Sequence, residues 1–397
     1  MTQRPGIYVH IPFCLRRCDY CDFTTFADRD QAIPAYVDAL CRHIAGSGSS
    51  RLARLGARSG PSAAIADFGR DSTMGEGRGH VFGSVFVGGG TPTYLPPADL
   101  TRIIRTIANT FDVTVDAEWT VEANPETVTE VMAAALADAG INRVSLGAQS
   151  FDDRVLTTLG RWHDPDSVHT AITRLTQAGI PRLSLDLIYG TPGETDASWQ
   201  RSLDVTVATG VRHISAYALT VEPNTPYAAR VRTEPALEPD EDIQATRMAM
   251  ADQTLGLAGL HRYEVSNWAQ PGQESRHNLT YWRGGDWLAF GSGAHGAWQG
   301  RRYWLVRDPD RYARMVQEGS EPLAGDEILD ADQIRLERLM MGLRLVEGVP
   351  SAEVQPLDPD TMTRLISRGL MTMRDGNRVA LTTLGMPMAG AVIRELA

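Results

Sequence analysis

Short apolar runs alternate with amphipathic stretches of helical periodicity through the first two thirds of the chain. Six of these runs are predicted to be buried strands: Ile7–Ile11, Val81–Val87, Glu118–Glu122, Val144–Ala148, Leu183–Ile188 and His213–Leu219. Strands that alternate with helices pair in parallel through right-handed crossovers. The pattern therefore predicts an α/β fold in which six βα units form an open, partial barrel.

The pattern changes at two places along the chain. Residues 46–80 are rich in Gly, Ser and Arg with little periodicity, which is typical of a flexible insertion. From about residue 320, helical segments (Asp332–Leu345, Asp360–Ser367) precede a hairpin-like stretch, Met371–Leu381, with a turn at Asp375-Gly376. We expect a core barrel over residues 1–300 and a small, winged-helix-like domain over 301–397. Because Arg is mixed with many acidic residues there, a packing or lid role is favoured over DNA binding.

Composition and charge exclude several classes of function. A formal net charge of −11 gives no broad attraction to nucleic acid or anionic lipid, so no nucleic-acid partner is expected. All 38 residues of the Lys+Arg count are Arg, which excludes Schiff-base, pyridoxal-lysine and Walker-A chemistry. Neither a signal-like start nor a run of 18 apolar residues occurs. We therefore expect a cytoplasmic protein without a membrane segment.

Three of the four cysteines lie together, in the spacing C-x3-C-x2-C, on the loop that leaves the first predicted strand. They are Cys14, Cys18 and Cys21, whereas Cys41 lies in a helix-like run and is expected to be a core thiol. In a reducing compartment this spacing favours a metal site over a disulfide. Three thiolates can hold three irons of a [4Fe–4S] cluster and leave the fourth open to an exchangeable ligand. A structural zinc site would need a fourth Cys or His placed nearby, and none is.

Polar or glycine-rich signals follow each of the other predicted strands. Along the chain they are Gly88–Thr91, Glu122 with Asn124, Gln149, Asp186 with Gly190, and Tyr217. Parallel α/β folds place their sites at the carboxyl edge of the sheet, so these strand ends are expected to meet in one pocket. Taken singly, each signal can equally be a tight turn or a loop cap.

The cysteine loop resembles that of the radical-SAM superfamily, in which S-adenosylmethionine binds the open iron and is cleaved by electron transfer from the cluster. The segments Gly88–Thr91, Gly147–Phe151, Leu159–Arg161 and Asp186–Gly193 resemble the branch that contains oxygen-independent coproporphyrinogen III oxidase and a haem chaperone. The resemblance covers nearly all of the chain outside 46–80. It implies these neighbours of S-adenosylmethionine: Tyr8, Tyr20, Gly89, Gly90, Thr91, Glu122, Gln149, Arg161, Asp186 and Ala218.

Three features favour the chaperone over the oxidase within this branch. The oxidase has another cysteine two residues beyond the third, where this chain has Phe23, and a long segment ahead of its cluster. The chaperone has the hexapeptide H-N-x-x-Y-W, which stands here at residues 277–282. The resemblance implies that four residues of this hexapeptide bind haem: His277, Asn278, Tyr281 and Trp282. From composition alone, His277 and Tyr281 can instead be packing residues beneath the barrel mouth.

The sequence thus predicts a radical-SAM haem chaperone that binds haem and transfers it to a target haemoprotein. The expected partners are haem, a haem-accepting protein and an electron donor, and peripheral encounters with membrane-bound haemoproteins are compatible with this role. The alternative is an enzyme that performs radical oxidative decarboxylation of porphyrinogen propionates, as the oxidase does.

Overall fold

The structure is a computed structural model and describes residues 3–47, 80–354 and 359–396. Almost all of the predicted insertion at 46–80 lies outside the described residues. No described helix is both long and apolar enough to cross a lipid bilayer.

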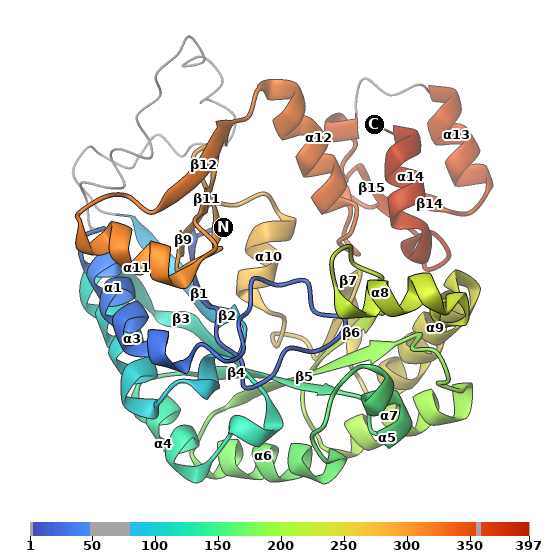
Figure 1. Cartoon of the computed structure of the whole chain (residues 1–397). Helices are drawn as coiled ribbons and strands as arrows, with labels where there is room; N and C mark the ends of the chain where they lie inside the picture. The colour runs from blue at the N-terminus through green and yellow to red at the C-terminus, as the bar shows by residue number, and fades with distance from the viewer. Residues whose placement is uncertain (1–2, 48–79, 355–358, 397) are drawn as a thin grey trace.

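A curved sheet of twelve strands forms the body of the molecule, in the order β12-β11-β10-β9-β1-β2-β3-β4-β5-β6-β8-β7. All six predicted strands are present, and each is parallel to the next. They are β1 (Gly6–Ile11), β2 (Val81–Gly89), β3 (Asp112–Ala123), β4 (Arg143–Gln149), β5 (Arg182–Tyr189) and β6 (His213–Ala218). Figure 1 shows helices on the outside of the curve. The predicted open α/β barrel is confirmed.

Helices between the strands cover the outer face of the sheet. They are α1 (Ile33–Ala45), α3 (Pro97–Thr110), α4 (Glu130–Asp138), α5 (Asp153–Thr158), α6 (Pro165–Gln177), α7 (Asp196–Ala208), α8 (Pro226–Thr233) and α9 (Glu241–Leu257). The buried side of α3 consists of Leu100, Ile103, Ile104 and Ile107, which follow the spacing of one helix face. Burying each such side chain contributes roughly 1.5–3 kcal/mol. Cys41 of α1 packs part-buried against the same core, as predicted.

The sheet extends beyond the predicted strands on both sides. On one side β9 (Trp287–Phe290) pairs in parallel with β1, and β10 (His295–Trp298), β11 (Arg301–Leu305) and β12 (Leu323–Ile328) follow antiparallel. On the other side β8 (Asn267–Ala269) and β7 (His261–Glu264) continue from β6. Helix α10 (Arg276–Trp282) lies inside the curve of the sheet (Figure 1), whereas α11 (Pro309–Gln317) packs against α1.

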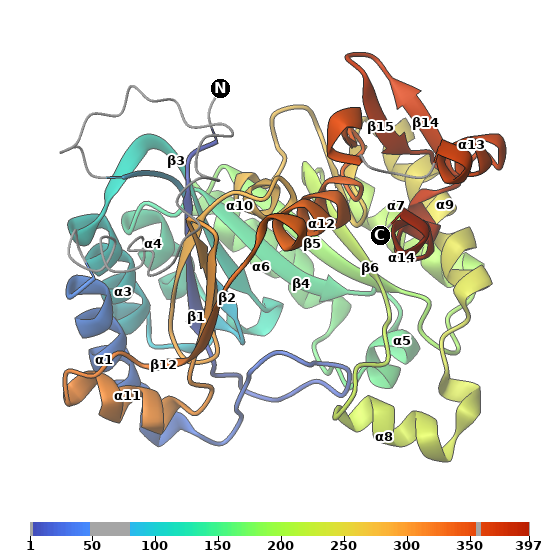
Figure 2. The same ribbon diagram turned by 90° about the horizontal axis from the view of Figure 1, so that it is seen from above.

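The last part of the chain has a core of its own. It contains α12 (Ala331–Gly342), β13 (Val349–Pro350), α13 (Pro359–Ser367), the predicted hairpin of β14 (Met371–Arg374) and β15 (Arg378–Leu381), and α14 (Ala389–Leu396). Figure 2 shows α13, α14, β14 and β15 to one side of the sheet, near α9. Strands β11 and β12, which fall within the predicted second domain, belong to the large sheet. The division into two domains itself stays a prediction.

Candidate functional site

A cleft of about 430 Å³ opens at the carboxyl ends of the parallel strands. It is lined by residues from all six predicted strand ends, which therefore meet as expected. Twelve of the predicted site residues line it: Cys14, Cys18, Tyr20, Cys21, Gly89, Gly90, Thr91, Glu122, Gln149, Arg161, Asp186 and Ala218. Tyr8 does not line this cleft, and its hydroxyl is hydrogen-bonded to Nδ1 of His10 at 2.9 Å.

The three cysteines stand on the loop after β1, part-buried and free of disulfides. Backbone hydrogen bonds between Cys14 and Phe26 (3.0 Å) and between Phe26 and Pro12 (2.7 Å) close the loop. Burial raises the pKa of the Cys14 thiol to about 12. This sulfur is therefore a thiolate only where a metal ion or another cation offsets its charge. Three cysteine sulfurs on one closed loop fit a cluster.

The glycine-rich end of β2 lies directly against the cysteine loop. A Cβ added to Gly90 would stand 2.7 Å from the carbonyl oxygen of Phe13 and 3.1 Å from Sγ of Cys14. Thr91, next in the chain, donates from its hydroxyl to Sγ of Cys14 at 3.6 Å. Only glycine allows this close approach, so the end of β2 packs directly on the cysteine loop, and the N–H of Gly90 donates to the carbonyl oxygen of Ile11 at 2.8 Å.

Arg161 brings a positive charge to the cysteines. Its Nη1 donates to Sγ of Cys18 at 3.4 Å, and its Nη2 donates to Oδ1 of Asn124 at 2.8 Å and to the carbonyl oxygen of Gly147 at 3.0 Å. The side chain is buried, and among the described residues its Nε has no hydrogen-bond partner. A buried guanidinium with donors to spare fits a site that takes a negatively charged cluster and ligand.

Two half-buried carboxyl groups, Glu122 of β3 and Asp186 of β5, line the cleft. Burial raises the pKa of Glu122 to about 7, although its Oε2 accepts a hydrogen bond from the backbone N–H of Gly89 at 2.9 Å. Burial also raises the pKa of Asp186, whose two oxygens each accept from Ser145 Oγ at 3.0 Å. Such carboxyl groups favour a ligand that brings an ammonium group or hydroxyl donors.

Gln149 is held in a strained backbone conformation at the end of β4. Its φ is 61°, in the left-handed region, and the pairing of β4 with β5 shifts register just before it. This conformation costs about 1–2 kcal/mol for a residue other than glycine. A Cβ at Gly147 would lie 2.7 Å from Nε2 of Gln149, so glycine makes room for this side chain. Strain of this kind clusters at ligand sites.

The four residues of the hexapeptide lie on α10 and outside this cleft. His277 is fully buried, with Nδ1 bonded to Ser84 Oγ at 2.9 Å and Nε2 bonded to the Tyr281 hydroxyl at 2.7 Å. Burial lowers the pKa of His277 to about 4, so the imidazole is neutral. To ligate haem iron it must give up one of these hydrogen bonds. Haem binding by His277, Asn278, Tyr281 and Trp282 stays a prediction.

A polar network that sequence reasoning missed holds α10 in place. The Glu118 carboxylate accepts from the backbone N–H groups of Arg276 and His277, both at 3.1 Å, and from Nη1 of Arg182 at 2.8 Å. A second pair of hydrogen bonds lies at the end of β1. Nδ1 of His10 is bonded to the Tyr8 hydroxyl, and Nε2 of His10 is bonded to the carbonyl oxygen of Thr24 at 2.8 Å. The sequence did contain a sign of this network, because charged residues stand inside otherwise apolar strand runs and a buried charge requires a partner.

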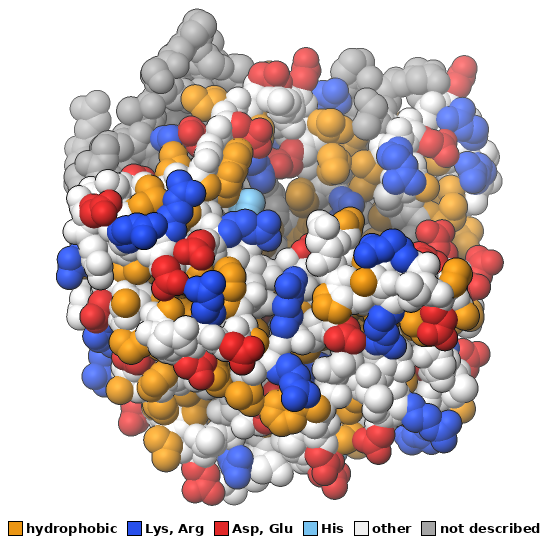
Figure 3. Space-filling view, viewed as in Figure 1, with side chains coloured by type: hydrophobic (Ala, Val, Ile, Leu, Met, Phe, Trp, Pro, Cys, Tyr) orange, Lys and Arg blue, Asp and Glu red, His pale blue; other side chains and the backbone are white. Residues whose placement is uncertain are grey.

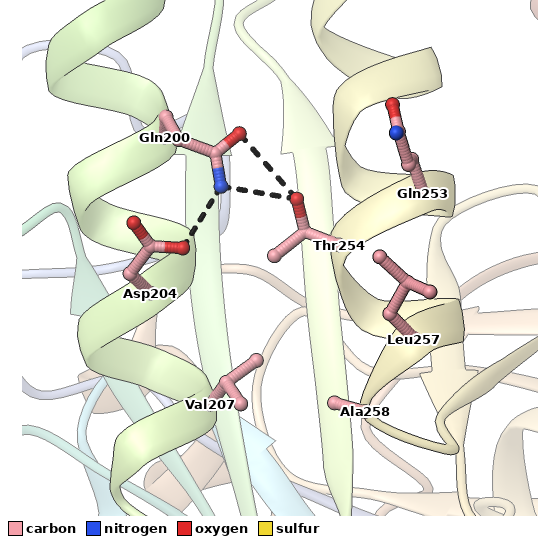
Figure 4. Close-up of a pocket in the computed structure, with 7 residues that line it drawn as sticks. All are labelled: Gln200, Asp204, Val207, Gln253, Thr254, Leu257 and Ala258. Atoms are coloured by element: carbon pink, nitrogen blue, oxygen red, sulfur yellow. Dashed lines mark hydrogen bonds between the residues drawn. The ribbon is translucent and has the colours of Figure 1, made fainter.

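A second hollow, of about 460 Å³, lies on the outer surface between α7 and α9 (Figure 4). Nε2 of Gln200 donates to Asp204 at 2.9 Å and to Thr254 at 3.1 Å. These polar groups satisfy one another, and the hollow contains none of the predicted residues. The candidate site is therefore the cleft at the strand ends.

Comparisons with known proteins agree with this geometry. The model of the Radical SAM superfamily matches residues 73–205. The chain is 40% identical to the haem chaperone HemW of Mycobacterium tuberculosis over 391 residues, covering 98% of this chain and 94% of that protein. It is 30% identical to HemW of Bacillus subtilis over 403 residues, covering 98% and 99%. The structure of coproporphyrinogen III oxidase (HemN) from Escherichia coli, a radical-SAM enzyme, matches with a TM-score of 0.79 over 99% of this chain and 90% of that chain, at 21% identity. This last likeness concerns the fold.

Proposed function

This chain belongs to the HemW family of radical-SAM proteins, and from that premise we propose that it is a haem chaperone that binds haem and transfers it to a haem-accepting protein. The observation that carries the proposal is similarity to HemW along the whole chain, together with the complete H-N-x-x-Y-W hexapeptide on α10. Phe23, which stands where the oxidase has a further cysteine, is 67% exposed at the cleft. It argues against the oxidase alternative.

Membership of the radical-SAM superfamily implies a [4Fe–4S] cluster and S-adenosylmethionine. We assign the cluster to Cys14, Cys18 and Cys21, with the Arg161 guanidinium beside Cys18. When bound, the two groups together supply one-electron chemistry at the sulfonium. The cleft also presents the Glu122 carboxyl group at the end of β3.

The remaining neighbours are assigned by their position in the cleft. Glu122 is placed to meet the ammonium of S-adenosylmethionine, and Gln149 and Asp186 to meet its ribose hydroxyls. Gly89, Thr91, Tyr20 and Ala218 form the walls of the same cleft. Tyr8 lies outside the residues that line the cleft, and its ring packs near that of Phe86. We assign it to the residues that support the cleft from beneath.

An anaerobic haem titration of the reconstituted protein tests the proposal. We expect stable haem uptake, followed by transfer of haem to an apo-haemoprotein that is separated on a column and assayed for its own spectrum. Transfer should depend on direct contact with the loaded chaperone rather than on free haem. Turnover of coproporphyrinogen III to vinyl products in the same preparation would instead support the oxidase.

The setting in which the chaperone works also follows as a proposal. We propose that it acts in the cytoplasm, receives electrons from a separate donor, and meets membrane-bound recipients at their cytoplasmic surface. The net charge of −11 disfavours binding to nucleic acid and is compatible with a freely diffusing carrier.

A further inference from the structure

The middle of the cysteine loop is held at a point far from β1. The loop (residues 12–26) leaves β1 and reaches across the carboxyl ends of the strands to α8, as Figure 1 and Figure 2 both show. There the carbonyl oxygen of Asp19 accepts from the backbone N–H of Tyr227 at 2.8 Å. Tyr20 packs beside it, against a small hydrophobic cluster to which α5 and α8 both contribute. The loop is therefore fastened at the far side of the cleft as well as at β1.

One cation, Arg230 of α8, joins two of the segments that meet here. Its Nη1 donates to Oδ2 of Asp19 at 3.0 Å and to the carbonyl oxygen of Thr158, the last residue of α5, at 3.1 Å. The guanidinium also lies over the ring of Tyr227, 5.7 Å from its centre. That ring is buried, and its hydroxyl donates to the carbonyl oxygen of Leu237 at 2.8 Å. Arg230 is therefore held in place as a bridge between the cysteine loop and the end of α5.

The two acceptors of Arg230 stand next to the two partners of another hydrogen bond. Asp19 follows Cys18 directly in the chain. Thr158 comes three residues before Arg161, whose backbone N–H closes the turn by donating back to α5 at 2.8 Å. Nη1 of Arg161 donates to Sγ of Cys18 at 3.4 Å. Arg230 thus holds both sides of the contact between Arg161 and the cysteine loop.

Gly160 allows the two segments to approach each other closely. Its φ is 68°, in the left-handed region that favours glycine. A Cβ at this position would stand 2.9 Å from Cγ and 3.2 Å from the backbone nitrogen of Asp19. The turn before Arg161 therefore packs directly on the cysteine loop, and a displacement of either segment changes the distance from Arg161 to Cys18.

The ion pair between Arg230 and Asp19 is open to solvent in part, since its side chains are 41% and 34% exposed. Figure 3 shows Arg and acidic side chains side by side over the cysteine loop and α8. Dissolved salt screens an ion pair of this kind, whereas it affects the buried core little. This contact can therefore be weakened without unfolding the barrel.

We infer that Arg230 is a positioning residue for the cluster, which through Asp19 sets where the cysteine loop lies against Arg161. The inference rests on the proposed assignment of the cluster to the three cysteines. Arg230 acts on the hydrogen bond that Cys18 receives, and it needs no contact with the cluster itself.

The reduction potential of the reconstituted cluster tests the inference. Arg230→Gln should make the potential more negative, as Arg161→Gln does, because Arg161 loses its alignment with Cys18. Arg230→Lys should shift it in the same direction, since its side chain keeps the charge but is one bond shorter and cannot hold both acceptors in place. Combined with Arg161→Gln, the Arg230→Gln change should add little, because both act on one contact. Urea denaturation midpoints close to the parent's show that the variants are folded.

Release of iron to a chelator provides a second measurement. Without the ion pair the loop should open more often, so Arg230→Gln should release iron roughly twofold to fivefold faster than the parent. Added salt should speed release from the parent and change the variant little. Arg364→Gln is the matched control, because Arg364 pairs with Glu395 at 3.1 Å among the C-terminal elements, with side chains 52% and 36% exposed. It should behave as the parent does in both measurements.

Three outcomes would count against this role. An unchanged potential in Arg230→Lys would show that the position of the side chain is not what matters, and would overturn the inference. Iron release as fast in the Arg364 control as in Arg230→Gln would overturn it too. A parent that holds no iron would instead refute the cluster assignment, and the inference about Arg230 would fall with it.

Discussion

Glu118 accepts a hydrogen bond from the backbone N–H of His277 at 3.1 Å, although the two residues are 159 positions apart in the sequence. The carboxylate is buried, which by itself would raise its pKa, but Arg143, Arg182 and the backbone donors outweigh burial and lower the pKa of Glu118. Glu118 is therefore charged when folded. It fastens the beginning of α10, and with it the whole hexapeptide, to the inside of the barrel.

Replacing Glu118 by Ala should destabilise the fold strongly. The change leaves the half-buried Arg182 without its carboxylate and two helix N–H groups without an acceptor, which costs about 3–5 kcal/mol. Urea denaturation measures the loss. The matched control is Glu318→Ala on the surface, expected within about 0.5 kcal/mol of the parent. Since the folded pKa of Glu118 is depressed, its contribution is present above the usual carboxyl pKa and is lost as the pH falls through the folded value. Equal denaturation midpoints for both variants would refute the anchoring role.

Iron content tests the cluster ligands. The parent, reconstituted anaerobically, should hold about four irons per chain. Serine in place of Cys14, Cys18 or Cys21 should abolish the cluster, because each thiolate holds a different iron. Cys41→Ser is the control and should keep the parent's iron content, since Cys41 packs on α1. Loss of iron in the Cys41 variant would contradict the assignment.

Arg161 should tune the reduction potential of the cluster. Its guanidinium donates to Sγ of Cys18, and a positive charge beside the sulfurs stabilises the reduced, more negative cluster. Arg161→Gln should therefore make the potential more negative by some tens of millivolts. Arg161→Lys keeps the charge and should shift it less. A potentiometric titration followed by electron paramagnetic resonance measures both, and equal shifts would mean that charge is not the cause.

Binding of S-adenosylmethionine should weaken as the pH falls through about 7, the pKa to which burial raises Glu122. Below that pH the carboxyl group is protonated and cannot offset the ligand's ammonium. Glu122→Gln keeps an acceptor for the N–H of Gly89 but removes the charge, so its binding should be weak and flat with pH. The ligand-induced change in the spectrum of the reduced cluster provides the measurement. A parent whose affinity does not change between pH 6 and pH 8 would exclude this role.

The strand ends and the cleft were predictable for a physical reason. Each parallel strand is buried on both faces and so forms a continuous apolar run, and the sheet then brings the residues after each run to one edge. Gln149 and Asp186 are brought to the same cleft in this way. The first half of β3 escaped prediction because polar residues alternate with Val there and only one of its six side chains is buried.

The place of α10 could not be predicted from the chain. The hexapeptide indicates haem chemistry through residue type, but whether the nitrogens of His277 are free depends on Ser84, which lies 193 positions away. The short strands β9–β12 carry too few residues for a clear alternation, so their place in the sheet appeared only in the structure. Contacts between distant segments decide whether this histidine is free to meet a ligand.

A barrel that does not close keeps two edge strands. The unpaired N–H and C=O groups of an edge strand can pair with a strand of another chain and so start aggregation. One edge, β12, carries the exposed charges of Asp326 and Glu327, which disfavour such growth. The other edge, β7, is occupied from within the chain, since the N–H of Val346 donates to the carbonyl oxygen of Tyr263 at 3.1 Å. The C-terminal elements therefore cover part of the β7 edge and disfavour its pairing with another chain. A chain cut after residue 330 would expose this edge and should precipitate or form oligomers as its concentration rises.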